Sequence, residues 1–347
     1  MLRRFNQNLR ALIALAMVGV LCLVVMSACS SDTTPKSTDA TSVTPEGDAP
    51  LQVNVALASG PISVGMASFV SEAQQGKLSQ DYHVAVVTSS EQIAPAVEEG
   101  QVDIAVVTPS IASKLYNETD GNVMVVSIDS LGALGVVTGN KKIRRWADLA
   151  GKTVYMTDEG SVSEFVVDYL LESVGIADKV DIVYKSDSVE VAAMLRSERN
   201  AVGILSQPYA AVFRAEVKDK EVRQVMDVSK EWDETVSDAS RFVGGVTVVR
   251  KDFAKENPGV IEAFLEEQAA SVELAAVDPY SVLELIPAAG IMDAEMTTEV
   301  SVRACHPEFI TGKDMRAALA DYLNVLYNAN PSALGGYLPS GDFYYGV

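Results

Sequence analysis

The residues best suited to binding chemistry lie at one strand-to-helix junction. Residues 100–112 read GQVDIAVVTPSIA, and the apolar run 102–107 predicts a strand buried on both faces of a parallel sheet. Pro109 favours the first turn of a helix, and Thr108 before it can accept a hydrogen bond from a free helix N–H group. A helix that begins at the carboxyl edge of a sheet presents unpaired N–H donors and the positive end of its dipole. The sequence therefore predicts a ligand-binding corner at Thr108 and Ser110.

A second corner of the same kind follows later in the chain. A shift of 98 positions takes Ser90 to Ser188, each at the start of a helix pattern, and takes Thr108 to Ser206. Ser206 and Gln207 again follow a strand pattern, at 202–205, and precede a proline. Identity between the halves is low, so common ancestry is not established. The matching order of elements nevertheless predicts two similar lobes whose corners face each other.

Strand and helix patterns alternate along most of the chain, which predicts an α/β fold. Strands are expected at 53–57, 84–87, 102–107, 123–128, 134–138, 153–156, 202–205, 222–228 and 242–249. Helices are expected at 63–75, 90–99, 141–150, 161–174, 258–277, 281–289 and 312–328. We expect two lobes, each a mainly parallel sheet flanked by helices, with hinge crossings near Gly139 and Gly244. Lobe 1 would comprise 51–138 and 245–347, and lobe 2 would comprise 139–244.

The first 28 residues have the pattern of an export signal. A start containing Arg3, Arg4 and Arg10 precedes an apolar run, 11–26, that is short for a membrane span. The run ends at MSAC, which resembles the bacterial lipoprotein cleavage box and predicts lipidation of Cys29. An ordinary signal peptide and an uncleaved span are the alternatives. Residues 29–50, rich in Ser, Thr, Asp and Pro, predict a flexible tether. We expect a protein anchored to the outer face of the cell membrane through lipid.

Charge and reactive side chains limit the possible functions. The formal net charge of −20 argues against a nucleic-acid partner, although a local pocket of N–H donors can still hold a small anion. His83 and His306 are the two histidines, and no spaced Cys/His set suggests a metal site. Cys305 is left without a disulfide partner if Cys22 leaves with the leader and Cys29 carries lipid. We predict no catalytic residue, cofactor or metal.

The lipoprotein-type leader, the tether, the two lobes and the helical tail resemble the type 2 periplasmic binding proteins of ABC importers. Within these, the chain is similar to the nitrate, sulfonate, taurine and thiamine-precursor group, which includes SsuA-like proteins. The resemblance lies in the Gly60-Pro61 loop, GQVDIAVVTPS at 100–110, ADLAGKTV at 147–154, Gly160-Ser161, SQPY at 206–209 and VRKDFAKENP at 249–258.

This resemblance implies a protein without chemistry of its own, which closes two lobes on a small solute and presents it to the permease and ATPase subunits of a transporter. It also implies a set of ligand-binding residues in the cleft. They are Gly60, Pro61, Thr88, Ser89, Thr108, Ser110, Gly160, Ser161, Gln207, Tyr209 and Gly244.

These residues also have plainer interpretations. Thr108, Ser110 and Ser161 could serve only as helix caps, Tyr209 could pack in the core, and Gly60 could serve a tight turn. The loops contain no obvious arginine, so the charge of the solute stays open. Two other functions also stay open: a cofactor-biosynthesis enzyme on the same fold, and a lipoprotein that reports ligand binding to a membrane kinase.

Overall fold

The computed structural model describes residues 51–217, 222–236 and 239–347. These residues belong to one compact unit, Ala49–Val347. The predicted leader and the whole predicted tether, Cys29 included, lie outside the described residues. Among the described residues, no helix combines the length and apolar character needed to cross a membrane.

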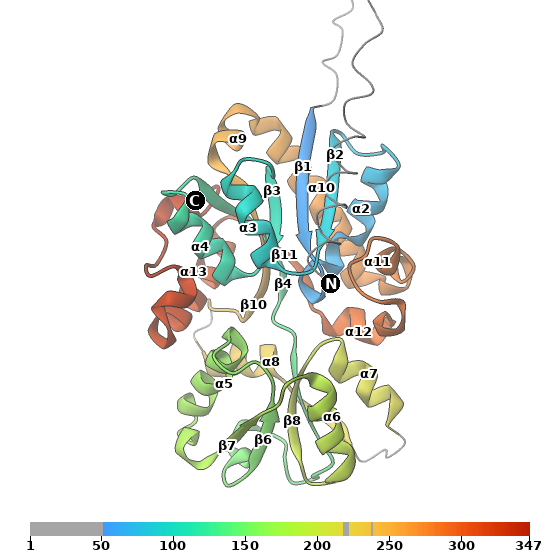
Figure 1. Ribbon diagram of the computed structural model, residues 1–347, viewed down its shortest axis with the longest axis vertical. Coiled ribbons are helices and arrows are strands. Elements are labelled where there is room, and N and C mark those ends of the chain that lie inside the picture. Colours follow the sequence, from blue (N-terminus) through green and yellow to red (C-terminus); the bar gives the residue numbers. More distant parts are fainter. Residues whose placement is uncertain (1–50, 218–221, 237–238) are drawn as a thin grey trace, which may run out of the picture. The chain divides into compact units, whose positions relative to one another are not determined.

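Two sheets organise this unit (Figure 1). Sheet A has the strand order β11-β4-β10-β3-β1-β2, and sheet B has the order β7-β6-β8-β5-β9. The strands of sheet A are β1 (Gln52–Ala58), β2 (Asp81–Val87), β3 (Ile104–Val107), β4 (Val123–Leu131), β10 (Val243–Arg250) and β11 (Pro307–Ile310). The strands of sheet B are β5 (Leu134–Thr138), β6 (Thr153–Met156), β7 (Asp181–Tyr184), β8 (Val202–Ser206) and β9 (Arg223–Asp227).

The two sheets share one arrangement. In sheet A, β1 pairs in parallel with β2 and β3, whereas β10 pairs antiparallel with β3 and β4. In sheet B, β6 pairs in parallel with β7 and β8, whereas β5 pairs antiparallel with β8 and β9. Each sheet therefore has three parallel strands with one antiparallel strand beside them. That strand is β10 in sheet A and β5 in sheet B, and in each case it is the first strand after the chain crosses from the other sheet.

Helices flank both sheets. The α-helices are α2 (Ala67–Gln74), α3 (Ser90–Glu98), α4 (Pro109–Glu118), α5 (Val162–Ser173), α6 (Ser188–Ser197), α7 (Tyr209–Glu216), α8 (Val228–Thr235), α9 (Lys251–Glu256), α10 (Pro258–Val277), α11 (Leu285–Ala288), α12 (Glu299–Ala304) and α13 (Gly312–Ala329). Short 3-10 helices are η1 (Pro61–Met66), η2 (Trp146–Leu149), η3 (Ala177–Lys179), η4 (Pro279–Val282), η5 (Ala294–Met296), η6 (Pro331–Leu334) and η7 (Gly341–Phe343).

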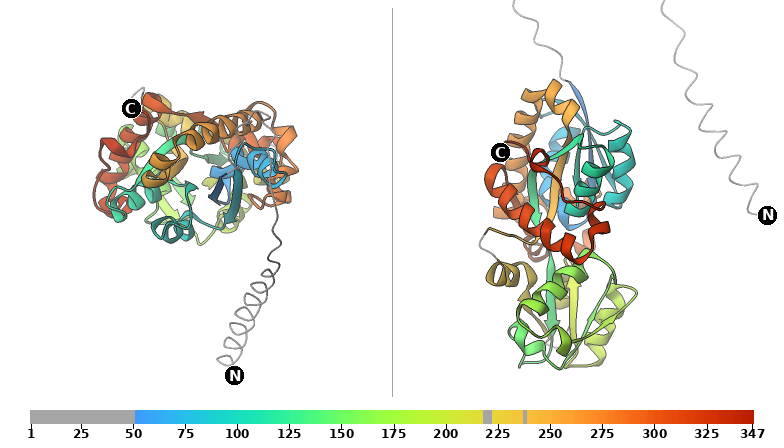
Figure 2. Two further views of the ribbon diagram at one scale, coloured as in Figure 1. Left: turned by 90° about the horizontal axis from the view of Figure 1, so that it is seen from above. Right: turned by 90° about the vertical axis from the view of Figure 1, so that its left-hand side faces the viewer.

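Alternating side chains of the strands build a core on each face of sheet A. In β1, Ala56 and Ala58 face the cluster that includes Ile111 of α4 and Leu319 of α13. Val55 and the other residues of the opposite face pack with α2, α9 and α10. Helix α10 accordingly lies on the side of sheet A opposite to α3 and α4 (Figure 2). This two-sided burial explains why the central strand β3, IAVV, is apolar along its whole length.

The structure differs from the sequence-based expectation at the first crossing. The chain leaves sheet A after Leu131 and enters sheet B at Leu134, so β5 lies in sheet B and the crossing precedes Gly139. Residues 134–138, which we expected in lobe 1, therefore pair with β8 and β9. The pattern of the β5 segment predicts a strand, but no local signal indicates which sheet it joins.

The polar stretch 141–150 forms only the single 3-10 turn η2 instead of the expected helix. Its buried side chains are Ile143, Trp146 and Leu149. They recur every three residues, which is the period of a 3-10 helix. The Asp148 carboxylate fixes this turn by accepting hydrogen bonds from the backbone N–H groups of Arg144 and Arg145.

Candidate functional site

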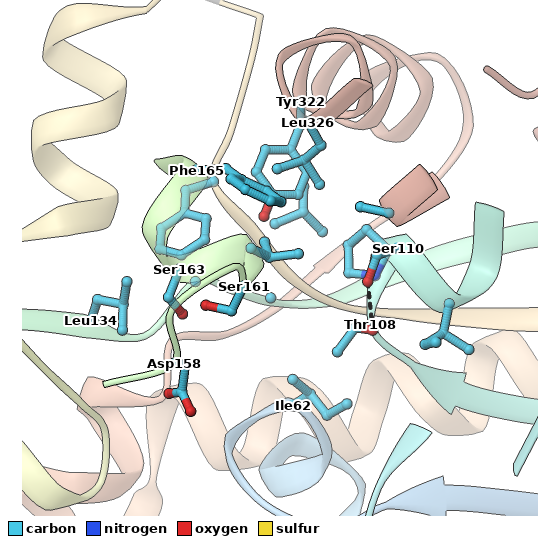
Figure 3. Close-up of a pocket in the computed structure, with 18 of the residues that line it drawn as sticks. Ile62, Thr108, Ser110, Leu134, Asp158, Ser161, Ser163, Phe165, Tyr322 and Leu326 are labelled. Atoms are coloured by element: carbon cyan, nitrogen blue, oxygen red, sulfur yellow. Dashed lines mark hydrogen bonds between the residues drawn. The ribbon is translucent and has the colours of Figure 1, made fainter. Parts of the chain in front are cut away.

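A pocket of about 570 Å³ lies between elements of the two sheets. It is lined by the start of η1, the first turns of α4 and α5, the crossing from β4 to β5, the start of β10, and α13 with η6 (Figure 3). Its volume is in the range of sites for small molecules. Helices α4 and α5 both begin at this pocket, each shortly after a strand ends. Their first turns therefore bring backbone N–H donors to the wall from both halves of the chain.

The corner at α4 provides two hydroxyl groups that are not used as helix caps. Thr108 is the N-cap residue, but its side chain makes no capping hydrogen bond. Instead, its Oγ1 lies 3.2 Å from Oγ of Ser110, and both side chains line the pocket (Figure 3). The backbone N–H of Thr108 is held by Oγ of Ser90 at 3.1 Å. The hydroxyl pair is therefore positioned by the backbone and available to a ligand.

The corner at α5 is organised differently. Ser161 is a capping residue, because its Oγ accepts a hydrogen bond from the backbone N–H of Glu164 at 3.5 Å. The Glu164 carboxylate reaches back and accepts a hydrogen bond from the N–H of Gly160. Gly160 has a φ of 78°, which favours glycine there. The first turn of α5 still presents Val162 and Ser163 to the pocket.

Lys114 supplies a positive charge and was not among the residues expected from the sequence. It is half-buried and lines the pocket one helical turn after Ser110. Residues four apart lie on the same face of a helix, so this spacing was the signal that could have revealed it. The two acidic residues of the lining, Glu91 and Asp158, are exposed. Lys114 thus brings a positive charge to the pocket lining, while both acidic residues of the lining are exposed.

Aromatic and apolar side chains form the remaining wall. Phe165 of α5, Phe242 before β10, and Tyr322 and Leu326 of α13 line it. The rings of Phe242 and Tyr322 are 5.9 Å apart. The hydroxyl of Tyr322 points towards the pocket (Figure 3), and it has no hydrogen-bond partner among the described residues. Burial of this phenol raises its pKa. A ligand with an apolar part and a polar atom near the Tyr322 hydroxyl would fit against this wall.

The pocket gathers six of the eleven ligand-binding residues expected from the sequence. They are Pro61, Thr108, Ser110, Gly160, Ser161 and Gly244. Gly244 has no room for a side chain, because a Cβ there would lie 2.5 Å from the carbonyl oxygen of Leu131. Close backbone approach therefore requires glycine at this point of the wall.

The other expected residues lie elsewhere. Gly60, Gln207 and Tyr209 line a second pocket, of about 590 Å³, and Pro61 lines both pockets. Thr88 and Ser89 line neither of these two pockets. The corners at Thr108 and Gln207 thus contribute to different pockets. In the first pocket, the start of α5 lies opposite the start of α4.

Gln207 has its side chain occupied within the protein. Its Nε2 donates to Oε1 of Gln224 at 3.1 Å, and its Oε1 accepts from the backbone N–H of Ala211 at 3.1 Å. The side chain is 3% exposed. These contacts fasten the start of α7 to β9. A ligand in the second pocket would have to displace them in order to use the amide group of Gln207.

The described residues contain no group of three or more His, Cys, Asp or Glu residues that could hold a metal ion. Cys305 is buried, and burial raises the pKa of its thiol to about 12. A thiol that stays protonated at neutral pH is a poor nucleophile. The arrangement around the first pocket is suited to holding a solute by hydrogen bonds, charge and apolar contact.

Comparisons with known proteins place this geometry in a family. Residues 72–290 match the family described as ABC transporter, phosphonate, periplasmic substrate-binding protein. No curated protein matches the sequence.

Solved structures resemble the fold over most of the chain. An ABC transporter protein from Parabacteroides distasonis has 18% identity and a TM-score of 0.69, covering 84% of this chain and 98% of that one. The aliphatic sulphonate-binding protein SsuA from Escherichia coli has 15% identity and a TM-score of 0.62, covering 84% and 94%. The Candida albicans CA3427 product, described as having the generic periplasmic binding protein fold, has 14% identity and a TM-score of 0.50, covering 84% and 93%.

The family match covers more than half of the chain, and the two-sheet architecture agrees with it. The predicted fold and the predicted role as the substrate-binding component of an ABC importer are therefore confirmed. The chain belongs to the family of phosphonate-type periplasmic substrate-binding proteins of ABC transporters.

Proposed function

We propose that the chain captures a small organic oxyanion in the first pocket by closing two lobes, and then delivers it to a membrane permease. In this proposal, lobe 1 carries sheet A, lobe 2 carries sheet B, and the crossings at 132–133 and just before β10 act as the hinge. The α4 corner belongs to lobe 1 and the α5 corner to lobe 2. A solute that touches both corners would favour the closed arrangement, because only that arrangement offers both sets of contacts.

The observation that carries this proposal is the group formed by Thr108, Ser110 and Lys114 at the start of α4. The hydroxyls of Thr108 and Ser110 lie next to a helix N-terminus and make no capping hydrogen bond. Lys114 lines the pocket one helical turn further on. All of these groups donate hydrogen bonds or carry positive charge, so together they favour an anion. The start of α5 supplies further N–H donors from across the pocket.

The test measures the melting temperature of the protein in the presence of methylphosphonate, ethanesulfonate and inorganic phosphate. At least one of these anions should raise the melting temperature in a dose-dependent way. In Lys114→Met, the affinity for that anion should fall roughly tenfold or more, because a charged hydrogen-bond donor is lost.

Lys142→Met is the matched control. Lys142 is an exposed lysine outside the pocket lining, and its loss should leave the affinity unchanged. Equal affinities in wild type, Lys114→Met and Lys142→Met would contradict an oxyanion site at α4. Turnover of a bound compound by the purified protein would instead favour an enzyme.

We also propose that Cys29 carries lipid and anchors the protein to the outer face of the membrane. The basic start, the apolar run and the MSAC sequence support this. Cells grown with a clickable palmitate analogue should label the wild type, and the label should be lost in Cys29→Ser. An unlabelled wild-type protein that is recovered without detergent would contradict the lipid anchor.

A further inference from the structure

The pocket has a third wall that the family match does not cover. Helix α13 and η6 lie after residue 290, where the match ends, yet Tyr322, Leu326, Asn330 and Ser332 all line the pocket. Tyr322 and Leu326 are four residues apart and therefore lie on one face of α13. Figure 3 shows these two side chains together on one side of the pocket. This wall is thus formed by residues outside the region that defines the family here.

The Tyr322 hydroxyl is unsatisfied in an otherwise well-packed side chain. The residue is fully buried, and its ring contacts those of Trp232 and Phe242 at 5.6 and 5.9 Å. Its hydroxyl has no hydrogen-bond partner among the described residues. A buried hydroxyl without a partner destabilises a folded protein, whereas a phenylalanine would fill the same space without this cost. The hydroxyl therefore does nothing to stabilise the unliganded protein, and it is a candidate for a hydrogen bond to a ligand.

Tyr116 of α4 provides a contrast to Tyr322. Its hydroxyl donates to Oδ1 of Asp342 at 2.6 Å and also contacts Oγ of Ser340. Its ring packs edge-on against Phe343. Tyr116 does not line the pocket, and its hydroxyl ties α4 to the C-terminal segment. Removal of that hydroxyl would therefore break existing contacts, unlike removal of the hydroxyl of Tyr322.

We propose that Tyr322 is a specificity-determining residue, whose hydroxyl hydrogen-bonds a polar atom on the body of the solute. This inference rests on the proposed function, which places the oxyanion of the solute at the corners of α4 and α5. The solute is then an organic oxyanion whose apolar body packs against Phe165 and Phe242 and carries a hydroxyl or carbonyl group. A site with a buried hydrogen-bonding group discriminates strongly against analogues that lack its partner, because the group then stays unpaired.

The first test uses matched pairs of probes that differ by one hydroxyl. The pairs are phenylphosphonate with 4-hydroxyphenylphosphonate, and benzenesulfonate with 4-hydroxybenzenesulfonate. For the wild type, the hydroxylated member of at least one pair should bind about tenfold more tightly by calorimetry. In Tyr322→Phe, that ratio should fall to about one, while in Tyr116→Phe it should stay as in the wild type. An equal ratio in wild type and Tyr322→Phe would overturn the inference.

The second test needs no ligand. Without solute, Tyr322→Phe should melt at the same temperature as the wild type or higher, because an unpaired buried hydroxyl is removed. Tyr116→Phe should melt at a lower temperature, because it loses two hydrogen bonds. A lower melting temperature of unliganded Tyr322→Phe would reveal a partner within the protein and overturn the inference.

The two proposals fail in different ways. If wild type binds both members of a pair equally, and Lys114→Met binds them weakly, the oxyanion site stands and the role of Tyr322 is wrong. If Lys114→Met retains wild-type affinity for every anion bound, the oxyanion site itself is wrong. The melting temperature of unliganded Tyr322→Phe decides whether the hydroxyl is unsatisfied in either case.

Discussion

Asp129 on β4 is a buried carboxyl group that no cation offsets within its hydrogen-bond network. It is 1% exposed. Ser127 Oγ and Gln268 Nε2 donate to its Oδ1 at 2.7 and 2.9 Å, and Thr247 Oγ1 donates to its Oδ2 at 2.8 Å. Burial raises the pKa of Asp129 to about 7, although these three hydrogen bonds act to lower it. The network therefore joins β4, β10 and α10 through a group that titrates near neutral pH.

This raised pKa predicts a pH dependence of stability. Between the ordinary pKa of about 4 and the raised value, the folded protein holds a proton that the unfolded chain has lost. The contribution of Asp129 to the free energy of unfolding is therefore lost as the pH rises through this window. Urea unfolding at pH 5 and pH 8 should show a decrease that is about 2–3 kcal/mol larger in wild type than in Asp129→Asn. Parallel pH profiles of the two proteins would contradict this.

At the level of secondary-structure elements, the sequence patterns predicted most of the strands in the two sheets and many of the helices around them. The shift of 98 positions pairs β2 with β7, β3 with β8, and α3 with α6, and the paired strands occupy equivalent places in the two sheets. The strands of parallel sheets are recognisable because burial on both faces makes them apolar throughout. The helix α10 was predicted with the bounds that the structure has.

Other elements could not be predicted because long-range pairing decides them. Whether β5 joins sheet A or sheet B depends on the partners β8 and β9, which come much later in the chain. β11 is a four-residue strand that begins with Pro307, so it has little local strand pattern. The helix expected at 63–75 begins with the 3-10 turn η1, because Gly60 and Pro61 set its first turn.

The sequence predicted those parts of the site that a single strand-to-helix junction forms. It did not predict the parts that form only when separate elements pack together. The corners at Thr108 and Ser161 follow from a strand that ends before a helix, and both line the pocket. The sequence could not distinguish their roles, since both residue types favour capping, yet only Ser161 makes a capping hydrogen bond. Tyr322 was not foreseen, because its place in the wall depends on the long-range packing of α13 against elements that lie far away in the sequence.

At the scale of the whole described unit, His306 joins parts of the two sheets. It lies between α12 and β11 of sheet A, and its Nε2 lies 3.0 Å from Oδ2 of Asp227, the last residue of β9 in sheet B. Its Nδ1 lies 3.0 Å from the carbonyl oxygen of Gly132, in the crossing between the sheets. A ring with acceptors at both nitrogens is best satisfied when both carry protons. The pair thus links the end of β9 in sheet B to the segment that precedes β11 in sheet A.

The pKa values of the pair follow from this geometry. Burial alone would lower the pKa of His306, but the hydrogen bond and charge of Asp227, together with the Gly132 carbonyl, raise it. For Asp227, burial would raise the pKa, but His306 and the backbone N–H of Ser229 lower it. Lys230 opposes the charged histidine, and Asp233 lies near enough to respond to it. Both shifts favour the ion pair.

The pair should therefore stabilise the protein most between about pH 4 and pH 6.5. Below this window the contribution is lost as the pH falls through the lowered pKa of Asp227. Above it the contribution is lost as the pH rises through the raised pKa of His306. His306→Gln should lower the free energy of unfolding by about 1–3 kcal/mol at pH 5.5, and by less at pH 9.

A double-mutant cycle with Asp227→Asn isolates this pair from the rest of the protein. Asparagine can still accept the hydrogen bond from the N–H of Ser229 that caps α8, while its NH2 group replaces the oxygen that faces His306. The change therefore removes both the charge and the acceptor for His306 but keeps the cap. If the ion pair joins the sheets, the coupling energy between the two substitutions should be clear at pH 5.5 and should shrink at pH 9. A coupling energy that is the same at both pH values would mean that the interaction does not depend on the charge of His306, and it would contradict the ion pair.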